Sequence, residues 1–378
     1  MSHPELLDDI TRAVLARDEV VRLLQGTHGE SAPVSKERVH AYIDELYTTQ
    51  RYFLYRALQH PLYPILRKIK RIVEHIETVQ AAVQTSRIIY ASNHRSHTDY
   101  LVEPLLLDDH GIRPPITAAG INLFGGPFGL IHRHVTGAIP IRRNTKDPIY
   151  LATLKAYVAE LLRRRDLLFY IEGGRSYSGE LKAPKTGLLH AAMQAGLPDV
   201  VVIPVAIAYD LVLEDRIVAR QGVKRRQRAF ARELAEMATM AVGYRSRAYV
   251  VFGDPIRLDG YAHESRRDVL ELAHVTRDAI GRLYKVLPTA LVSAAMKPSL
   301  TRRDLEARVA TLLDGLARIQ ANIGVRDARQ AVEEGVAALD RRGILHAERS
   351  RIRVRDRGLL KYYARSIQHL LPPAPNRT

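Results

Sequence analysis

A histidine and an aspartate five residues apart form the first pair in this chain whose types can carry out proton transfer. They are His94 and Asp99, in the segment Asn93–Tyr100, and they follow an apolar run at Arg87–Ala91. A carboxylate on one ring nitrogen of a histidine fixes its tautomer and stabilises the imidazolium, which suits a general base. The spacing Ser96-x-x-Asp99 also fits a helix capping box, which requires no chemistry. The pair is therefore a candidate base with its orienting acid, and a purely structural role in helix capping stays open.

Charged residues at the ends of two further apolar runs form a candidate anion site. Arg142 and Arg143 end one run, and Arg175 follows the other after an acid and two glycines. Ligands of open α/β sheets bind outside the carboxyl ends of the strands, and the guanidinium fork matches the oxygens of a phosphate. We therefore predict that these three arginines cradle a phosphomonoester, with Lys185 as a further cation.

The turn around Arg175 contains four candidate residues for positioning the substrate. Gly173 and Gly174 permit a tight turn and a close approach of the backbone to a ligand. Glu172 is expected to position an arginine or a substrate hydroxyl. Ser176 lacks the second glycine of a nucleophile elbow, so we assign it to positioning and expect no acyl-enzyme.

Short apolar runs alternate with helical patterns over residues 86–290, which is typical of an α/β domain with a largely buried sheet. Residues 1–85 instead have apolar residues at three- and four-residue spacing, which predicts helices at Glu37–Leu58 and Pro64–Val83. The strands predicted after the run at Arg87–Ala91 are Ile116–Ala119, Ala138–Ile141, Leu167–Ile171, Val200–Ala208 and Ala248–Phe252, and the helices are Ile149–Arg164 and Leu188–Ala195.

Residues 291–378 form a C-terminal helical appendage in this reading. The capping box Thr301-x-x-Asp304 opens one of its helices, and Arg351–Arg355 alternates with period two, as a β-wing does. Its helical segments are Ser299–Ile319, Asp327–Arg341 and Leu359–Leu371.

We therefore predict a central, mostly buried, mixed β-sheet flanked by helices. An N-terminal helical region occupies residues 1–85, a catalytic domain occupies residues 86–290, and the appendage at residues 291–378 has a winged helix as one option.

Composition narrows the classes of partner. The 378 residues have a formal net charge of +16, which favours nucleic acid, an anionic membrane surface or a phosphorylated substrate. Only 6% are aromatic and none is tryptophan, which weighs against single-stranded nucleic acid. The absence of cysteine excludes thiol catalysis and cysteine-ligated zinc, and we expect no metal. No stretch approaches the ~18 apolar residues of a spanning helix, so we expect no integral membrane protein.

Four blocks follow one another in the order typical of a known family, namely His94-x4-Asp99, Gly137–Arg143, Phe169–Ser176 and Val202–Val205. Three further segments extend the likeness, namely Gly120–Leu123, Pro184–Gly187 and Tyr362–His369. On these motifs the chain resembles the glycerophospholipid acyltransferases, and within them the bacterial glycerol-3-phosphate acyltransferases, over roughly residues 85–371. Any one block is a weak signal, whereas the ordered set is a strong one.

The resemblance implies a glycerolipid acyltransferase-like fold and a reaction. His94 is then the base that takes the proton of the sn-1 hydroxyl of glycerol 3-phosphate, with Asp99 orienting it. The acyl donor is acyl-CoA or acyl carrier protein, the product is lysophosphatidate, and no other cofactor is implied. Ile203 and Pro204 fall in the acyl-donor pocket. Tyr177 departs from the family, which often has arginine there, and one expected phosphate contact is therefore in doubt.

Other readings remain open. The acceptor can instead be dihydroxyacetone phosphate or a lysophospholipid, although Gly174 is the usual choice of the glycerol-3-phosphate enzymes. The chain can also be read as a winged-helix nucleic-acid-binding regulator that uses the basic cluster Arg349–Arg357. That reading does not explain the motifs at the strand ends, and we expect no nucleic-acid partner. The apolar segment Ile121–Ile131 can dock on a bilayer, line an acyl channel or be a core helix, and the basic run 224–228 can bind anionic lipid. We expect peripheral attachment at the cytoplasmic face of the cell membrane.

Overall fold

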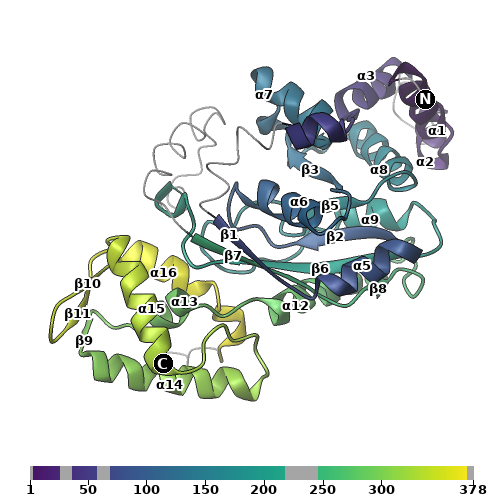
Figure 1. The fold of residues 1–378 in the computed structure, drawn as a ribbon. Coiled ribbons are helices and arrows are strands. Elements are labelled where there is room, and N and C mark those ends of the chain that lie inside the picture. Colours follow the sequence, from purple (N-terminus) through teal and green to yellow (C-terminus); the bar gives the residue numbers. More distant parts are fainter. Residues whose placement is uncertain (1–2, 26–35, 58–68, 218–245, 373–378) are drawn as a thin grey trace.

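A computed structural model describes residues 3–25, 36–57, 69–217 and 246–372 (Figure 1). Its centre is an eight-stranded sheet in the order β1-β7-β6-β2-β5-β3-β4, with β8 paired to β6. The strands are β1 Ile69–Glu74, β2 Arg87–Ser92, β3 Ile116–Gly120, β4 Ala138–Ile141, β5 Leu167–Tyr170, β6 Val200–Tyr209, β7 Ser246–Phe252 and β8 Ile256–Arg257. The five predicted strands are confirmed to within two residues, and the apolar run at Arg87–Ala91 is also a strand.

The sheet is mixed, as predicted. Strand β2 pairs in parallel with β5 and β6, whereas β6 pairs antiparallel with β7 and β8. All ten residues of β6 are buried, which explains why its sequence is a continuous apolar run rather than an alternating one. The register sets Ser92 of β2 beside Tyr170 of β5 and Val205 of β6. The segments that follow β2 and β5 therefore leave the sheet side by side at its carboxyl edge.

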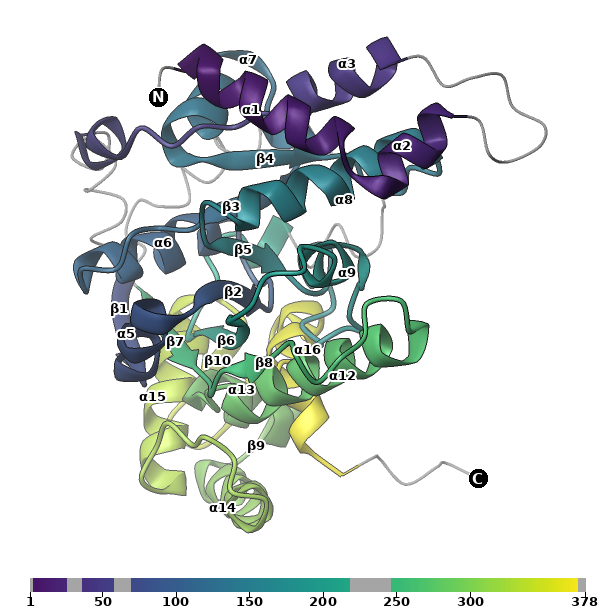
Figure 2. The ribbon, with the colours of Figure 1, turned by 90° about the vertical axis from the view of Figure 1, so that its right-hand side faces the viewer.

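Helices cover the sheet, and the N-terminal helices form a further layer on one of them (Figure 2). The helices α1, α2 and α3 pack on α8, and α12 packs on β6. Helix α8 begins where Asp147 accepts the backbone N–H groups of Ile149 and Tyr150, with Pro148 in the first turn. The helices are α1 His3–Leu15, α2 Asp18–Leu24, α3 Lys36–Leu46, α5 Ile76–Thr85, α6 Asp99–Asp109, α7 Gly126–Ile131, α8 Pro148–Leu162, α9 Gly187–Met193 and α12 Arg266–Leu283.

The continuous helix predicted at Pro64–Val83 is wrong. The segment instead contains strand β1 and helix α5, separated by His75 at a φ of 60°. Pairing with β7 along the whole of β1 outweighs the helical spacing of the apolar residues. The first five residues of this predicted helix lie outside the described residues. The helix predicted at Glu37–Leu58 is also shorter, because α3 ends at Leu46 and a separate short helix occupies residues 52–57.

The C-terminal elements follow one another in the order of a winged helix. A helix and a short strand precede two helices and a hairpin, and the three strands form a small antiparallel sheet in the order β10-β11-β9. Thr301 caps α14 by accepting the N–H of Asp304, as its capping box predicts. The elements are α13 Pro288–Ala295, β9 Ser299–Leu300, α14 Arg302–Arg318, α15 Ala328–Arg341, β10 Leu345–Ala347, β11 Ile352–Val354 and α16 Arg357–Arg365.

Candidate active site

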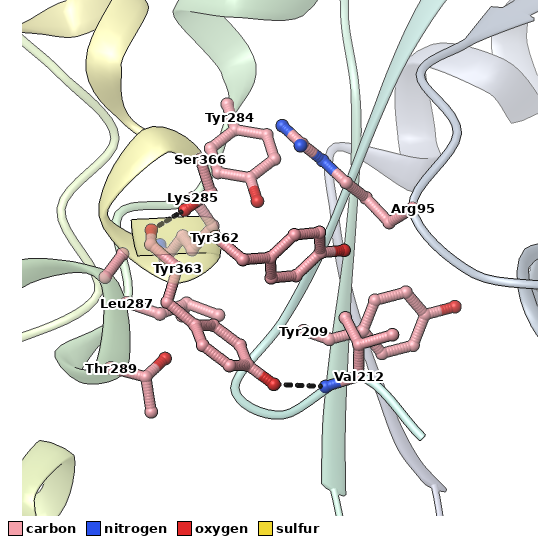
Figure 3. Close-up of a pocket in the computed structure, with 11 residues that line it drawn as sticks. Arg95, Tyr209, Val212, Tyr284, Lys285, Leu287, Thr289, Tyr362, Tyr363 and Ser366 are labelled. Carbon is pink, nitrogen blue, oxygen red and sulfur yellow. Dashed lines mark hydrogen bonds between the residues drawn. The ribbon is translucent and has the colours of Figure 1, made fainter. Parts of the chain in front are cut away.

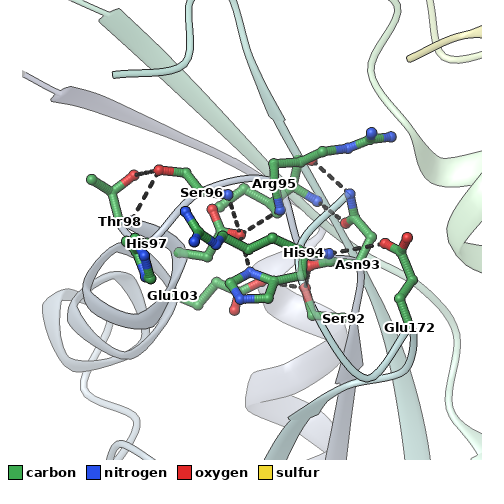
Figure 4. A network of polar contacts seen from close by, with 12 residues as sticks. Ser92, Asn93, His94, Arg95, Ser96, His97, Thr98, Glu103 and Glu172 are labelled. Carbon is green, nitrogen blue, oxygen red and sulfur yellow. Dashed lines mark hydrogen bonds and ion pairs between the residues drawn. The ribbon is translucent and has the colours of Figure 1, made fainter. Parts of the chain in front are cut away.

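The loop after β2 brings the histidine and aspartate together. His94 Nδ1 lies 2.8 Å from Oδ2 of Asp99, the first residue of α6 (Figure 4). The same oxygen accepts the backbone N–H groups of Arg95 at 2.7 Å and Ser96 at 2.9 Å. The other oxygen, Oδ1, accepts the hydroxyl of Tyr209 at 2.7 Å. The carboxylate is fully buried, so these four donors replace the water it has lost.

The capping box predicted at Ser96-x-x-Asp99 forms only in part. Asp99 accepts the N–H of Ser96, but the Ser96 hydroxyl donates to Glu214 Oε2 at 2.8 Å. The residue before the helix, Thr98, makes no capping bond with its side chain. The aspartate therefore shapes the loop and holds the histidine with the same oxygen.

Burial determines the protonation state of the pair. It raises the pKa of Asp99 to about 6, against the lowering effect of the hydrogen bonds that the carboxylate accepts. Burial, and then the nearby charges of Arg175 and Arg143, hold the pKa of His94 well below its ordinary value. The neutral imidazole donates from Nδ1 to the carboxylate, and its Nε2 keeps a lone pair for an incoming proton. Tyr170 stacks on the ring at 3.9 Å between centroids and fixes its plane.

Glu172 joins the two loops at the carboxyl edge of the sheet. Its Oε1 accepts the backbone N–H of His94 at 3.1 Å (Figure 4). Its Oε2 accepts the backbone N–H of Lys182 at 3.0 Å. Ser176 adds a third link, because its N–H donates to the His94 carbonyl at 2.9 Å. Both oxygens of Glu172 thus bind backbone amides, rather than the arginine or the substrate hydroxyl that we predicted.

The tight turn expected of the two glycines is present, and the close approach to a ligand stays a prediction. Gly173 has a φ of +69°, a conformation that costs little only for glycine, and the Lys185 side chain packs over it. A methyl group at Gly174 would make an ordinary contact with Arg143, 3.7 Å from its Nη1. Lys185 itself is exposed at the rim of the loop.

Two of the three predicted arginines lie beside the histidine. Arg175 is buried, 3.6 Å from Glu214, and its guanidinium lies 5.6 Å from the centroid of the Tyr177 ring. Arg143 is exposed to solvent and extends along the glycine loop. Although the Arg143 side chain keeps access to solvent, the groups around it partly desolvate its guanidinium, and this effect, followed by the charge of Arg175, lowers the pKa of Arg143. This partly open cluster can receive an anion next to Nε2 of His94.

Arg142 points elsewhere. Its guanidinium forms a two-pronged ion pair with Glu45 on α3 and lies over the rings of Tyr42 and Tyr150. Consecutive residues at a strand end point to opposite sides, so only one of the adjacent arginines can reach the histidine. The predicted phosphate contact of Arg142 is therefore replaced by an attachment of the N-terminal helices.

Ile203 and Pro204 lie at the centre of β6, inside the sheet. Ile203 is fully buried, and the carbonyl of Pro204 accepts the N–H of Gly253 at 2.9 Å. This position gives both residues a packing role, and their assignment to an acyl-donor pocket stays a prediction.

Arg95 extends away from the histidine toward the C-terminal unit (Figure 3). It donates to the carbonyl of Gly179, and its guanidinium lies 4.8 Å from the centroid of the Tyr284 ring. The small cavity around it is also lined by Tyr362 and has room for about one water molecule, ~10 Å³. Its walls come from both the central sheet and the C-terminal unit.

The segment Ile121–Ile131 does not form the core helix that was one of its readings. It contains a 3-10 turn and α7, and both Ile121 and Leu130 are exposed. The nearby short helix exposes Phe53 and Leu54 as well, with Phe53 84% exposed. We call these four residues the apolar patch. A hollow of about 390 Å³ next to it is lined by Arg51, Leu130, Ile131, His134 and Val135.

Sequence reasoning missed several residues that complete the site. Lys182 and Glu214 bring charges to the cluster, and Tyr209 and Tyr170 hold the His94–Asp99 pair. Glu103, one helical turn after Asp99, is buried and accepts the hydroxyl of Ser92. Tyr170 and Tyr209 are the last residues of β5 and β6, and this position is a weak signal without the pairing of the strands, whereas Lys182 and Glu103 carry no such signal.

Neither a metal centre nor a spanning helix is found in the described ranges. No three histidine or carboxylate side chains there are grouped so that they could hold a metal ion. No helix in the same ranges is long and apolar enough to cross a bilayer.

Residues 70–208 match the family model described as Acyltransferase. The chain is 30% identical over 383 residues to a glycerol-3-phosphate acyltransferase of Aeromonas hydrophila, covering 90% of this chain and 47% of that protein. It is 33% identical over 269 residues to one of Pseudomonas aeruginosa, covering 67% of this chain and 32% of that protein. Among solved structures, the 1-acyl-sn-glycerophosphate acyltransferase of Thermotoga maritima is similar at 13% identity and a TM-score of 0.36, covering 74% of this chain and 96% of that one.

These sequence matches confirm the predicted resemblance. The chain carries an acyltransferase domain and is similar to glycerol-3-phosphate acyltransferases over most of its length. It spans about half the length, or less, of the curated relatives that it matches.

Proposed function

We propose that this protein transfers a fatty acyl group from an acyl thioester to the sn-1 hydroxyl of glycerol 3-phosphate and so forms lysophosphatidate. The observation that carries the proposal is the juxtaposition of a buried His94–Asp99 pair with the cations Arg143 and Arg175 at the carboxyl edge of the sheet. A base next to an anion site is what a phosphorylated alcohol requires of an acyltransferase. The similar proteins named above support the same acceptor.

In this mechanism Nε2 of His94 takes the proton of the sn-1 hydroxyl while the hydroxyl oxygen attacks the thioester carbonyl. Asp99 holds the Nδ1–H and stabilises the imidazolium that forms. The tetrahedral intermediate collapses with breakage of the C–S bond, and the imidazolium gives its proton to the departing thiolate. No acyl-enzyme is formed, so both substrates are bound when the acyl group moves.

The cations orient the acceptor. Arg143 is open to solvent and Arg175 is held by Glu214, so one can move onto the phosphate while the other provides a fixed fork. The phosphate thereby places the distal hydroxyl of the substrate near the imidazole. We propose acyl-CoA or acyl carrier protein as the donor, and both are compatible with the site.

We also propose peripheral attachment to the cytoplasmic face of the cell membrane through the apolar patch. Phe53, Leu54, Ile121 and Leu130 expose large side chains, and Arg51 lies beside them at the hollow near α7. Apolar side chains with basic neighbours suit the boundary of an anionic bilayer. The basic run 224–228 lies outside the described residues and does not enter the argument.

The experiment is acyl transfer from a long-chain acyl-CoA to radiolabelled glycerol 3-phosphate, with the wild type beside His94→Ala. We expect lysophosphatidate from the wild type and a loss of about 100- to 10,000-fold in kcat in the variant. Equal rates from the two proteins would refute the assigned base.

Parallel assays address the alternative substrates and membrane attachment. Dihydroxyacetone phosphate and a lysophospholipid compete as acceptors in the same assay, and acylated carrier protein replaces acyl-CoA as donor. Flotation with anionic vesicles compares the wild type with Phe53→Ser, and equal binding would remove Phe53 from the membrane contact.

A further inference from the structure

The loop between Glu172 and α9 carries a further cation, Lys182, beside the arginine cluster of Arg143 and Arg175. The Lys182 side chain is half-buried, and its Nζ donates to the carbonyl of Arg175 at 2.5 Å. The ammonium also lies 5.4 Å from the centroid of the Tyr177 ring, on which Arg175 lies as well. One ring thus gathers two cations from the same loop.

The position of this lysine relative to the base is fixed by the backbone. Its N–H shares the carboxylate of Glu172 with the N–H of His94, at 3.0 and 3.1 Å. The loop is anchored a second time where Ser176 donates to the His94 carbonyl. The backbone of Lys182 is thereby tied to the backbone of His94, and its ammonium lies at the carbonyl of Arg175.

Positive charge is in excess at this point. In the part of the chain that the structure describes, neither Lys182 nor Arg143 has a carboxylate within 4 Å, whereas Arg175 is 3.6 Å from Glu214. Glu172, the acid of this loop that precedes the glycines, uses both oxygens on backbone amides. Burial lowers the pKa of Lys182, and the charges of Arg95, Arg143 and Arg175 add to that effect against the opposing charge of Glu172. Cations held together at such a cost are typical of a site that an anion completes.

We propose that Lys182 is a phosphate-binding residue of this enzyme, and that with Arg143 and Arg175 it selects a phosphomonoester acceptor beside His94. This inference rests on the proposed function and assigns one more residue to its acceptor site. Lysine contributes a compact charge that can follow the phosphate, whereas the arginines supply oriented donors. Loss of the ammonium should therefore weaken the acceptor and leave the acyl donor unaffected.

The test compares Lys182→Met and Lys182→Arg with the wild type and with Lys297→Met. Lys297 is an exposed lysine of the C-terminal unit, far along the chain from the cluster, and serves as the matched control. We expect Lys182→Met to raise the KM for glycerol 3-phosphate by about 10- to 100-fold, which is the effect of losing one charged hydrogen bond. The KM for the acyl donor should stay within twofold, and Lys182→Arg should recover much of the loss.

A second readout does not depend on turnover. Inorganic phosphate and glycerol 3-phosphate should each raise the melting temperature of the wild type and of Lys297→Met, and raise that of Lys182→Met much less. A KM for glycerol 3-phosphate within twofold of wild type, with an undiminished melting shift, would overturn the role of Lys182 and leave the proposed function intact. A wild type that transfers no acyl group would refute the proposed function. The phosphate-induced shift would then still decide whether Lys182 binds the anion.

Discussion

Removal of one hydroxyl that touches the catalytic carboxylate should shift the pH dependence of the enzyme. The Tyr209 hydroxyl donates to Oδ1 of Asp99 at 2.7 Å, and this bond lowers the pKa of Asp99. Tyr209→Phe deletes the donor in a buried site and leaves the ring. Because the ionised carboxylate loses more than the protonated one, the pKa of Asp99 must rise in the variant.

The size of the shift follows from the strength of such a bond. A hydrogen bond to a buried charge contributes about 1.5–3 kcal/mol, and one pKa unit corresponds to about 1.4 kcal/mol. In the wild type the pKa of Asp99 is about 6, so the His94–Asp99 pair takes up its inactivating proton near that pH. The variant should take it up about 1–2 pH units higher. Its kcat/KM at pH 7 should then fall by about 2- to 10-fold and recover at pH 9.

The assay is the pH profile of kcat/KM for glycerol 3-phosphate between pH 5 and pH 9, at saturating acyl donor. Tyr249→Phe is the matched control, because Tyr249 is a half-buried tyrosine on β7 that does not contact the pair. An acid limb that coincides in wild type and Tyr209→Phe would refute the reasoning. A loss that is the same at every pH would do so too, since it would indicate misplacement of the histidine rather than a change in ionisation.

Three other substitutions should separate stability from catalysis. Arg142→Leu should leave the KM for glycerol 3-phosphate within twofold and lower the free energy of unfolding in urea by up to about 1 kcal/mol, because it removes the partly exposed ion pair with Glu45. Gly179→Ala should destabilise the protein by about 2 kcal/mol or more in the same assay, because Gly179 has a φ of +85° and a methyl group would clash with the carbonyl of Tyr362. Burial and the charge of Asp99 raise the pKa of Glu103. The wild type therefore loses stability as the pH rises above the pKa that this carboxyl has in the unfolded chain. Glu103→Gln removes the loss and should raise the melting temperature, increasingly from pH 5 to pH 8.

The strands and the contact between His94 and Asp99 could be predicted from the sequence because local patterns encode both. A run such as Val200–Ala208 is apolar at every position, and a strand buried on both faces is its simplest explanation. The His94–Asp99 contact follows from five residues of separation at a strand end. Segment Pro64–Val83 failed for the opposite reason, because its strand exists only through pairing with β7, more than 170 residues later.

In the anion site, too, local sequence predicts some residues, and contacts with distant segments determine the others. Arg175 could be predicted, whereas Arg142 and Arg143 have indistinguishable sequence contexts, and only Glu45 on a distant helix separates their roles. Lys182 has no motif of its own. It joins the site because Glu172 binds its backbone N–H, a contact that the sequence does not show.

The C-terminal unit has the element order of a winged helix, but its contacts do not indicate nucleic-acid binding. Its element order suits nucleic-acid recognition, but Tyr363 and Arg342 meet the buried Asp215 of the central domain, with distances of 2.6 Å from the Tyr363 hydroxyl and 2.5 Å from Arg342 Nη2. Removing one partner of such a buried pair typically costs about 3–5 kcal/mol, because the other charge is left without compensation. Arg95, the residue after the catalytic histidine, is buried against Tyr284 at the same boundary. The unit therefore supports the loop that carries the base, and its winged-helix order gives a stable packing solution rather than evidence for a nucleic-acid partner.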